Sequence, residues 1–470
     1  MFHSKRAMEK AIHDTLRRWH RLDSKLPLEQ LYLVNQWPEE KRMLLNDGGE
    51  SAVVKSIVRF YIEKMKSEPK TKQLGHILTR RFLEGVGTKT IAYDHGKSVD
   101  QINRVQKKAM ATLTELVWEA EEQALHALKI RQLGNLDPKT YQELIGVEGT
   151  KSALLTALAD TEDRRTINLV GLGGLGKSAL ADAVCRDLSE GLQFEHIFWV
   201  KVPSVRMIPE ANEVVYAALL GSINDQLSGE YADHDASNHE RIVRDYLQQK
   251  QCLLVIDNVE ASEHLHFLIQ KLGDLSPSKI LITSRARFVG QAGVNQILLE
   301  ELQESDAFAL IRHWADHRGQ TELAEADKPT LQAIYDVTGG NPLALKLVVG
   351  LTTYNLPLVA TLTGLRAGRE GEAKDLYTRI YWYAWHQLDP SAQRVLKAML
   401  LSGIRGTKSG RLQQQTKLED AVYWQSVNDL LKLSLLETAG TPLEPRYSIH
   451  QLTASFLNTE IVRPKGGGKK

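Results

Sequence analysis

The sequence predicts a multidomain protein with an all-helical N-terminal region, a central α/β domain built on a parallel sheet, and a mostly helical C-terminal region. Two patterns support this fold class. Residues 1–133 carry amphipathic repeats of helical period and almost no strand signal. Between residues 140 and 300, short β-branched runs alternate with helical stretches, which is typical of a parallel sheet covered by helices. The chain of 470 residues is long enough for roughly three domains.

The composition is that of an ordinary folded protein, with 42% hydrophobic residues, 25% charged residues and a formal net charge of +1. This balance excludes a whole-molecule attraction to nucleic acid or membranes. Cys185 and Cys252 lack the spacing of a zinc site or a disulfide framework, which favours a reducing compartment. No apolar run approaches the ~20 residues of a membrane span, and the N-terminus lacks a signal-peptide core. We therefore expect a cytoplasmic protein without membrane contact.

Within the helical region 1–133, residues 78–113 have the spacing of a helix-turn-helix. Ala92 falls where two helices must cross closely, Gly96 falls at a turn that favours positive φ, and Ser98 can cap the second helix. The residues expected to pack that helix inward are Val99, Ile102, Val105, Ala109 and Leu113. The segment resembles the DNA-reading C-terminal region of bacterial sigma factors.

The outward face of this second helix predicts a contact with duplex DNA. Residues 51–112 carry 13 lysines and arginines against 5 acidic residues, a local excess of positive charge that the near-neutral total hides. The candidate DNA-binding residues are Lys97, Ser98, Gln101, Asn103, Arg104, Lys107 and Lys108. Two alternatives stay open, because a helix-turn-helix can also bind protein and because lysines and arginines often only solvate a helix face.

The stretch NLVGLGGLGKSAL predicts a phosphate-binding loop between a strand and a helix. Gly171, Gly176, Lys177 and Ser178 fill the pattern GxxxxGK[ST], in which glycines let backbone N–H groups point at phosphate oxygens. The following helix adds its positive N-terminal end. We expect Lys177 to neutralise the β and γ phosphates and Ser178 to supply a ligand for Mg²⁺.

Polar residues at the ends of two later strands complete the predicted catalytic set. The run CLLVIDN places Asp257 where it can reach the magnesium ion from the strand next to the phosphate loop. The run KILITSR ends in Arg285, which can sense the terminal phosphate or alternatively cap the strand in solvent. We predict Lys177, Asp257 and Arg285 as catalytic residues, with Glu260 as a candidate for a second acid.

Six segments occur in order between residues 140 and 460: ELIGVE, GLGGLGKS, LLVIDN, LITSR, GGNPLAL and SIHQL. Together they resemble the NB-ARC class of STAND signal-transduction ATPases, a family of P-loop nucleotide switches. The resemblance implies a nucleotide-binding domain at 140–300, a helical ARC1-like domain at 301–375 and a winged-helix domain at 376–460. It also implies that these domains close over ADP, and that exchange for ATP opens them and permits self-association. The composition of the C-terminus predicts a flexible basic tail at 461–470.

The resemblance assigns nucleotide contacts outside the phosphate loop. Pro342 of GGNPLAL would pack against the adenine, and His450 would reach the ADP phosphates from the winged-helix domain. Taken alone, Pro342 fits a helix start and His450 fits an ordinary surface or core histidine. Together with the phosphate loop, the predicted nucleotide-binding residues are Ile145, Gly146, Gly171, Gly173, Gly174, Gly176, Lys177, Ser178, Ala179, Pro342 and His450.

Three departures from the family pattern predict tight nucleotide binding with slow turnover. Asn258 follows Asp257 where a second acid is common, and an amide cannot accept the proton of an attacking water. Val147 replaces an arginine, and Gln451 replaces an acid. We therefore expect a slow ATPase that acts as a clamp around its nucleotide rather than as a motor.

The leading hypothesis is an ATP/ADP-dependent switch that controls an N-terminal DNA-binding helix-turn-helix, as a transcription regulator or a component of a defence or mobile-element system. The alternative is a signalling adaptor whose N-terminal helices recruit a protein effector on nucleotide-driven oligomerisation, without DNA contact. Both hypotheses require ATP or ADP with Mg²⁺, a protein trigger or effector, and further copies of the chain as partners. Salt-dependent binding to duplex DNA separates them.

Overall fold

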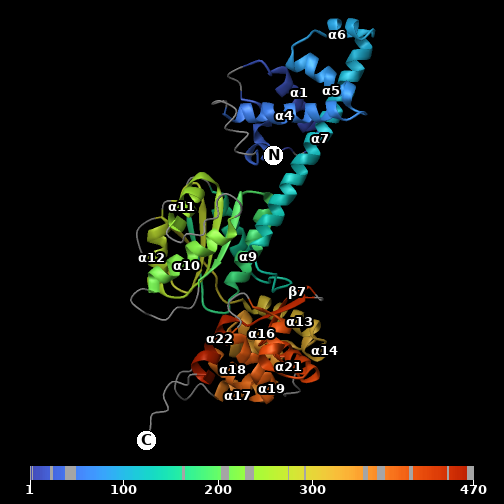
Figure 1. The fold of residues 1–470 in the computed structure, drawn as a ribbon. Helices are drawn as coiled ribbons and strands as arrows, with labels where there is room; N and C mark the ends of the chain where they lie inside the picture. Colours follow the sequence, from blue (N-terminus) through green and yellow to red (C-terminus); the bar gives the residue numbers. More distant parts are fainter. Residues whose placement is uncertain are drawn as a thin grey trace. The chain divides into compact units, whose positions relative to one another are not determined.

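The computed structural model describes residues 2, 4–21, 25–37, 49–160, 165–202, 211–227, 238–273, 275–289, 293–352, 358–367, 376–401, 406–441 and 444–462. The predicted tail at 461–470 therefore lies outside the described residues from position 463 onward. The chain divides into two compact units, Met1–Arg131 and Gln132–Lys470 (Figure 1). No helix among the described residues combines the length and the apolar character that a membrane crossing requires.

The N-terminal unit contains helices and no strand among its described residues, as the sequence predicts. The helices are α1 (Lys5–Arg17), η1 (Pro27–Gln30), α2 (Tyr32–Asn35), α4 (Gly49–Ser67), α5 (Lys72–Leu78), η2 (Thr79–Leu83), α6 (Thr88–Asp94) and α7 (Val99–Gly134). Aliphatic side chains such as Ile12 and Ile57 form the core. Glu121 is also buried, and its carboxylate accepts hydrogen bonds from the N–H groups of Tyr32 (2.7 Å) and Leu33 (3.0 Å) at the start of α2. Burial raises the pKa of Glu121.

The predicted turn at Gly96 joins α6 to α7, and Gly96 has a φ of +59°. Ala92 is buried, as expected for a close helix crossing. Ser98 and Gln101 cap α7 reciprocally. The Ser98 N–H donates to Gln101 Oε1 (2.9 Å), and the Gln101 N–H donates to Ser98 Oγ (3.2 Å). The local geometry predicted for these residues is therefore present.

The inward face of α7 is confirmed for Ile102, Ala109 and Leu113, all of which are fully buried, and Val105 is partly buried. The expectation for Val99 was wrong, because this side chain is 39% exposed. The small apolar cluster beneath α6 and α7 begins at Ile102, and the first turn of α7 extends beyond it.

The central domain contains the five predicted strands in one parallel sheet of order β2-β3-β4-β1-β5. The strands are β1 (Thr166–Val170), β2 (His196–Lys201), β3 (Cys252–Val259), β4 (Lys279–Ser284) and β5 (Val294–Leu298). The helices are α8 (Glu148–Ala159), α9 (Lys177–Gly191), α10 (Ala211–Gln226), α11 (His239–Gln249) and α12 (Ser262–Leu272). Leu254 and Ile256 of β3 join a core with α10, α11 and α12, whereas Leu253 and Val255 join a core with α8 and α9. Helices therefore cover both faces of the sheet.

The strand order corrects one expectation about Asp257. Strand β4 lies between β1 and β3, so the strand that carries Asp257 is not the neighbour of the phosphate-loop strand. The apolar runs of β3 and β4 are equally consistent with either position, and the sequence pattern cannot order them. The intervening strand places Thr283 and Ser284 beside the phosphate-loop strand.

The C-terminal region, from residue 301 onward, is mostly helical. Its helices are α13 (Glu304–His317), α14 (Thr321–Ala324), α15 (Lys328–Thr338), α16 (Pro342–Thr352), α17 (Leu358–Ala367), α18 (Leu376–Gln387), α19 (Pro390–Ala398), η5 (Met399–Leu401), α20 (Ser409–Thr416), α21 (Asp420–Lys432), α22 (Gln451–Phe456) and η6 (Leu457–Val462). The strands β6 (Thr407–Lys408), β7 (Glu437–Thr441) and β8 (Glu444–Ser448) form an antiparallel sheet of order β6-β8-β7. Strands β7 and β8 pair as an antiparallel hairpin.

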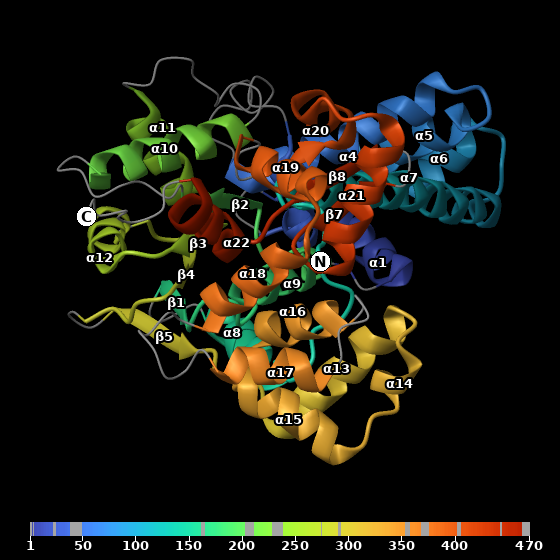
Figure 2. The same ribbon diagram turned by 90° about the horizontal axis from the view of Figure 1, so that it is seen from below.

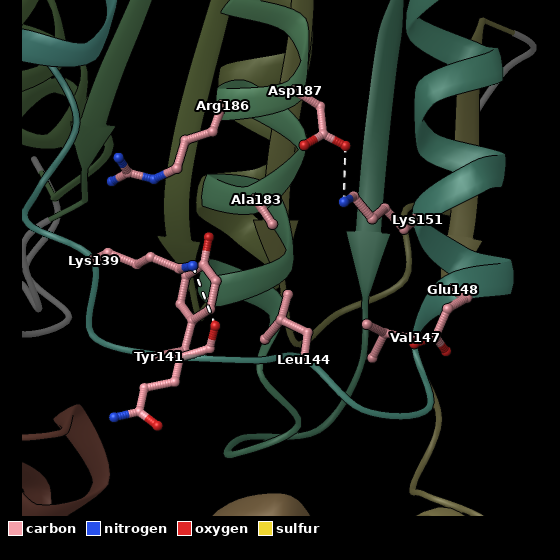
Figure 3. A pocket seen from close by; sticks show the side chains of 10 residues that line it. Lys139, Tyr141, Leu144, Val147, Glu148, Lys151, Ala183, Arg186 and Asp187 are labelled. Carbon is pink, nitrogen blue, oxygen red and sulfur yellow. Dashed lines mark hydrogen bonds and ion pairs between the residues drawn. The ribbon is translucent and has the colours of Figure 1, made fainter. Parts of the chain in front are cut away.

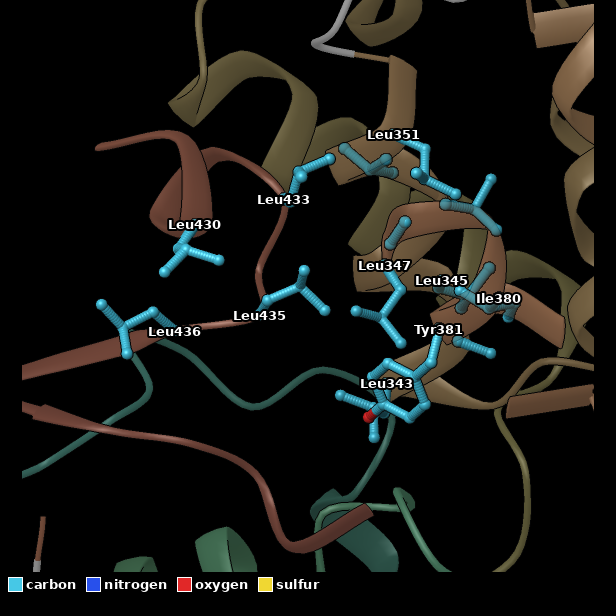
Figure 4. Close-up of a cluster of buried hydrophobic side chains, with 14 of the residues drawn as sticks. Leu343, Leu345, Leu347, Leu351, Ile380, Tyr381, Leu430, Leu433, Leu435 and Leu436 are labelled. Atoms are coloured by element: carbon cyan, nitrogen blue, oxygen red, sulfur yellow. The ribbon is translucent and has the colours of Figure 1, made fainter. Parts of the chain in front are cut away.

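One hydrophobic core runs through this C-terminal region. Helices α16, α17 and α18 lie side by side (Figure 2). Leucines of α16, such as Leu347, share the core with Tyr381 of α18 and with Leu433 and Leu435 at the end of α21 (Figure 4). The core therefore joins the predicted segments 301–375 and 376–460 directly.

Candidate functional site

The phosphate loop, Gly171–Gly176, connects the end of β1 to the first residue of α9, as predicted. The Nζ of Lys177 donates hydrogen bonds to the backbone carbonyls of Gly171 (2.8 Å) and Leu172 (2.7 Å). Burial and then the nearby charge of Arg285 lower the pKa of Lys177 to about 8. A buried cation beside a second cation gains stability from an anion, so this loop has the electrostatics of a phosphate site.

Ser178 and Asp257 lie together at the carboxyl end of the sheet. Ser178 Oγ donates to Asp257 Oδ1 at 2.7 Å, and the same carboxylate oxygen accepts from Thr283 Oγ1 at 2.6 Å. The carboxylate is buried. A hydroxyl and a carboxylate oxygen are the ligand types that Mg²⁺ takes in proteins, with water and phosphate oxygens completing the shell. The residues present therefore fit a magnesium ion.

Asn258 follows Asp257 at an irregular position of β3. The pairing of β3 with β4 shifts register between Ile256 and Val259, and Asn258 has a φ of +73°. Its N–H donates to Thr283 Oγ1 at 2.9 Å. The sequence pattern assigns no role to Thr283. Its double role, toward Asp257 and toward Asn258, follows from the position of β4 between β1 and β3.

The predicted sensor Arg285 and the candidate acid Glu260 form an ion pair with an Nη2–Oε1 distance of 2.7 Å. Each side chain is 39% exposed, so solvent screens the pair and its contribution to stability is small. Both charges are engaged with each other. The structure thus brings Lys177, Asp257, Glu260 and Arg285 to one end of the sheet, with Glu260 turned to Arg285.

The segment upstream of the sheet contacts the C-terminal region. Ile145 packs against the C-terminal core. A Cβ on Gly146 would lie 2.8 Å from Leu302 Cδ2, so only glycine fits there. Val147, which replaces an arginine of the family pattern, is buried in the core of the α/β domain.

The phosphate loop is hydrogen-bonded to the C-terminal helices. The Gly173 carbonyl accepts from Asn341 Nδ2 (3.0 Å) and from the Tyr377 hydroxyl (2.9 Å). The Gly174 carbonyl accepts from the Leu343 N–H at 3.2 Å. A Cβ on Gly174 would lie 2.6 Å from the Tyr377 hydroxyl oxygen, so the approach is too close for any other residue. These bonds place the start of α16 and the start of α18 directly on the loop.

Two of these contact residues were missed from the sequence. Asn341 stands in the quoted segment GGNPLAL, but only its neighbour Pro342, the first residue of α16, was assigned a role. Besides its bond to the loop, Asn341 Oδ1 accepts from the Leu343 N–H at 3.0 Å and so caps α16. Tyr377 belongs to no motif, and no local signal identifies it.

His450 caps α22 and lies among the charges of the site. Its Nδ1 accepts from the Leu452 N–H at 3.1 Å, so in the neutral ring the proton is assigned to Nε2. Desolvation lowers the pKa of His450 to about 4, opposed by Glu437 and assisted by Lys346, Arg285 and Lys177. The Leu452 side chain would lie 3.3 Å from a Cβ on Gly173, so the start of α22 also touches the loop.

An ion pair fastens the hairpin to the helices beside this histidine. Lys346 Nζ of α16 and Glu437 Oε1 of β7 are 3.0 Å apart. Both side chains are largely buried, and the charge of Lys346 holds the pKa of Glu437 below its usual value despite desolvation.

Leu144 and Val147, which flank the predicted nucleotide-binding residues Ile145 and Gly146, line a cavity of about 320 Å³ (Figure 3). Its lining comes from residues 139–151 and from α9. Two of the lining cations are paired with carboxylates, Lys151 with Asp187 at 2.8 Å and Arg186 with Asp182 at 2.7 Å, and Lys139 Nζ donates to the Gln142 carbonyl at 3.2 Å. The Tyr141 hydroxyl donates to the same Asp182 at 2.7 Å. This cavity therefore does not have the electrostatics of the phosphate loop.

The remaining predicted positions are surface residues. Ala179 is partly exposed in the first turn of α9. In the N-terminal unit, Asn103, Arg104, Lys107 and Lys108 are exposed on α7, and Lys97 is partly exposed in the preceding turn. Ser98 and Gln101 are exposed as well, with one oxygen of each held in the helix cap.

The chain is similar over part of its length to plant disease resistance proteins and to a WD repeat-containing protein. The disease resistance protein RPM1 of Arabidopsis thaliana is 25% identical over 249 residues, which cover 51% of this chain and 25% of RPM1. An uncharacterized WD repeat-containing protein of Nostoc sp., alr2800, is 26% identical over 337 residues, which cover 65% of this chain and 24% of that protein. This chain therefore spans about a quarter of the length of these relatives.

Solved structures show a more distant likeness. The STAND protein PH0952 of Pyrococcus horikoshii, which has a tetratricopeptide repeat sensor, aligns with a TM-score of 0.45 and 15% identity over 70% of this chain and 44% of that one. The Aeropyrum pernix ORC2 protein aligns with a TM-score of 0.34 and 14% identity over 71% of this chain and 98% of that one.

The residues that match a known family include most of the candidate site. The model of the NB-ARC domain matches residues 147–320, which include the phosphate loop, Asp257 and Arg285. The parallel sheet, the loop and the Ser178–Asp257 pair are the parts that a P-loop nucleotide site requires. The nucleotide-binding domain of this chain is therefore an NB-ARC domain of the P-loop NTPase class.

Proposed function

We propose that the chain is an ATP/ADP-dependent switch in which the nucleotide holds the C-terminal helices against the phosphate loop. The observation that carries this proposal is the set of bonds from Asn341, Tyr377 and Leu343 to the carbonyls of Gly173 and Gly174. Phosphates bind the N–H groups of such a loop, so a change of nucleotide acts on the peptide units that these side chains contact.

The roles of the site residues follow from their chemistry. Lys177 neutralises phosphate charge once it leaves the carbonyls of its own loop. Ser178 and Asp257 would hold Mg²⁺, which would supply neutralisation of phosphate charge. Neutral His450 offers its Nε2 proton to a phosphate oxygen, and Pro342 lies one residue from Asn341 for contact with the base. In this proposal the helical domain 301–375 and a winged-helix domain 376–460 close over the nucleotide together.

Slow turnover follows from two residues that come shortly after Asp257 in the chain, Asn258 and Glu260. Asn258 cannot accept a proton from an attacking water, and Glu260 is paired with Arg285 at 2.7 Å. The protein therefore holds its nucleotide rather than consuming it quickly. Phosphate release by the purified monomer with Mg-ATP tests this point. We expect turnover well below the typical enzyme median of ~10 per second, and multiple turnovers at or above that rate contradict a clamp.

The output that we propose is DNA binding by the N-terminal unit. Its support is the α6–turn–α7 geometry around Ala92 and Gly96, the reciprocal cap of α7, and the exposed cations on that helix. The local charge excess between residues 51 and 112 is complementary to a phosphate backbone. Nucleotide exchange would then regulate DNA binding, together with self-association in the ATP state. A role in defence is in keeping with the disease resistance proteins among the relatives.

Salt-dependent binding to duplex DNA tests this output. We expect the full chain to bind with an affinity that falls with salt and that differs between ADP and a non-hydrolysable ATP analogue. Arg104→Ala and Lys107→Ala should each reduce the salt slope by about one. Lys10→Ala, which removes an exposed lysine of α1, is the matched control and should leave the slope unchanged. Absence of salt-dependent binding in both nucleotide states favours the adaptor that recruits a protein effector.

A further inference from the structure

The first turns of α7 present a specific combination of groups. Val99 is 39% exposed although it is apolar, and Asn103 lies four residues later on the same helical face. Asn103 is exposed, and no described residue binds its side chain. Arg104 and Lys107 flank this face with positive charge. An exposed apolar side chain in water is unfavourable. The major groove of DNA instead offers apolar methyl groups, hydrogen-bonding base edges and nearby phosphates, to which the apolar side chain, the free amide and the two cations are complementary.

The cap at the start of α7 changes which side chains can read bases. Recognition of adenine by a glutamine or asparagine needs both amide atoms, the oxygen for N6–H and the nitrogen for N7. In Gln101 the oxygen already accepts from the Ser98 N–H at 2.9 Å. While the cap is intact, one of the two acceptor sites of that oxygen is occupied and the amide is held toward Ser98, so Gln101 is less available for this two-bond contact. Asn103 retains both atoms for it.

The thymine methyl is the apolar group that base pairs present in the major groove. Val99, at the N-terminal end of α7, is the exposed apolar side chain on this face that can cover it. We propose that Val99 and Asn103 form a reading pair for neighbouring A·T base pairs, with Val99 against a thymine methyl and Asn103 on an adenine edge. The inference rests on the DNA binding proposed above and adds the base preference to it.

Base analogues test the pair without relying on any mutation. A duplex would first be selected from a random pool by the full chain, in the nucleotide state that binds more tightly. Each thymine would then be replaced by deoxyuridine, which removes only the methyl group, and each adenine by 7-deazaadenine, which removes N7. Fluorescence anisotropy gives the affinities. We expect one thymine at which deoxyuridine weakens binding about fourfold, the effect of one buried methyl-sized group. At a neighbouring adenine, 7-deazaadenine should weaken binding about fivefold or more.

Variants then assign each effect to its residue. Val99→Ala should abolish the thymine–deoxyuridine difference, and Asn103→Ala should abolish the adenine–7-deazaadenine difference. Ile130→Ala, which shortens another exposed apolar side chain of α7, is the matched control and should keep both differences. If the wild type binds the duplex but neither analogue weakens it, or if a difference survives in its variant, the reading pair is refuted while DNA binding stands. If no duplex is bound even at low salt, the proposed DNA binding itself fails.

Discussion

Removal of the Tyr377 hydroxyl tests the link between the phosphate loop and the C-terminal helices. Tyr377→Phe deletes the 2.9 Å bond to the Gly173 carbonyl and leaves the ring in place. Asn341 Nδ2 still donates to that carbonyl at 3.0 Å, so the carbonyl does not become an unsatisfied buried acceptor. The expected cost is therefore that of one ordinary hydrogen bond, about 1 kcal/mol.

That cost has a direct kinetic consequence in the proposed switch. If the closed arrangement loses about 1 kcal/mol, the open population rises about fivefold, and nucleotide that leaves only from the open form should dissociate about fivefold faster. Stopped-flow release of a fluorescent ADP measures this rate. Tyr383→Phe, on the same helix α18, is the matched control and should release ADP at the wild-type rate. Equal rates in Tyr377→Phe, Tyr383→Phe and the wild type would refute the coupling.

Three other changes have defined outcomes. Asn258→Asp should raise the rate of phosphate release at least about 10-fold by supplying a proton acceptor, whereas Asn258→Ala should not, and no gain in the aspartate variant would contradict the assignment of Asn258. The pKa of His450, about 4 in the folded chain, lies below its ordinary value, so the unfolded chain takes up the proton first as pH falls. The free energy of unfolding should therefore fall by up to about 3 kcal/mol between about pH 6.5 and pH 4, with no effect above that range. His450→Gln should flatten this decline. If the free energies of unfolding of the wild type and the variant fall in parallel with pH, the assignment of the decline to His450 is refuted. Glu121→Ala should lower the urea midpoint of the N-terminal unit, because it leaves the N–H groups of Tyr32 and Leu33 without their acceptor at a cost of about 2 kcal/mol. Glu121→Gln, which keeps an acceptor oxygen, should cost less, and equal losses would contradict the capping role.

Most of the correct predictions rest on sequence patterns that span only a few neighbouring residues. The phosphate loop follows from four fixed positions within eight consecutive residues, Gly171–Ser178, and the five strands follow from short apolar runs with clear boundaries. Lys177, Ser178, Asp257 and Arg285 come together because parallel strands end at the same edge of a sheet. A sequence pattern predicts such an edge even when it does not give the order of the strands.

The roles that the sequence did not predict depend on contacts between segments that are far apart in the chain. The bonds of Asn341 and Tyr377 to Gly173 join residues 168 and 204 positions apart, and neither has a local signature that indicates its partner. The role of Thr283 depends on strand order, which equally apolar runs do not encode. The burial of Val99 was predicted wrongly because helical periodicity identifies the inward face of a helix. It does not show where along that face the neighbouring helices stop covering it.

The nucleotide carried by the purified protein tests the central claim most directly. The full chain would be purified without added nucleotide and denatured, and the released compounds would be identified and quantified by anion-exchange chromatography. We expect close to one ADP per chain in the wild type and almost none in Lys177→Ala. A wild-type protein that carries no nucleotide, or a Lys177→Ala variant that carries as much as the wild type, would contradict that claim.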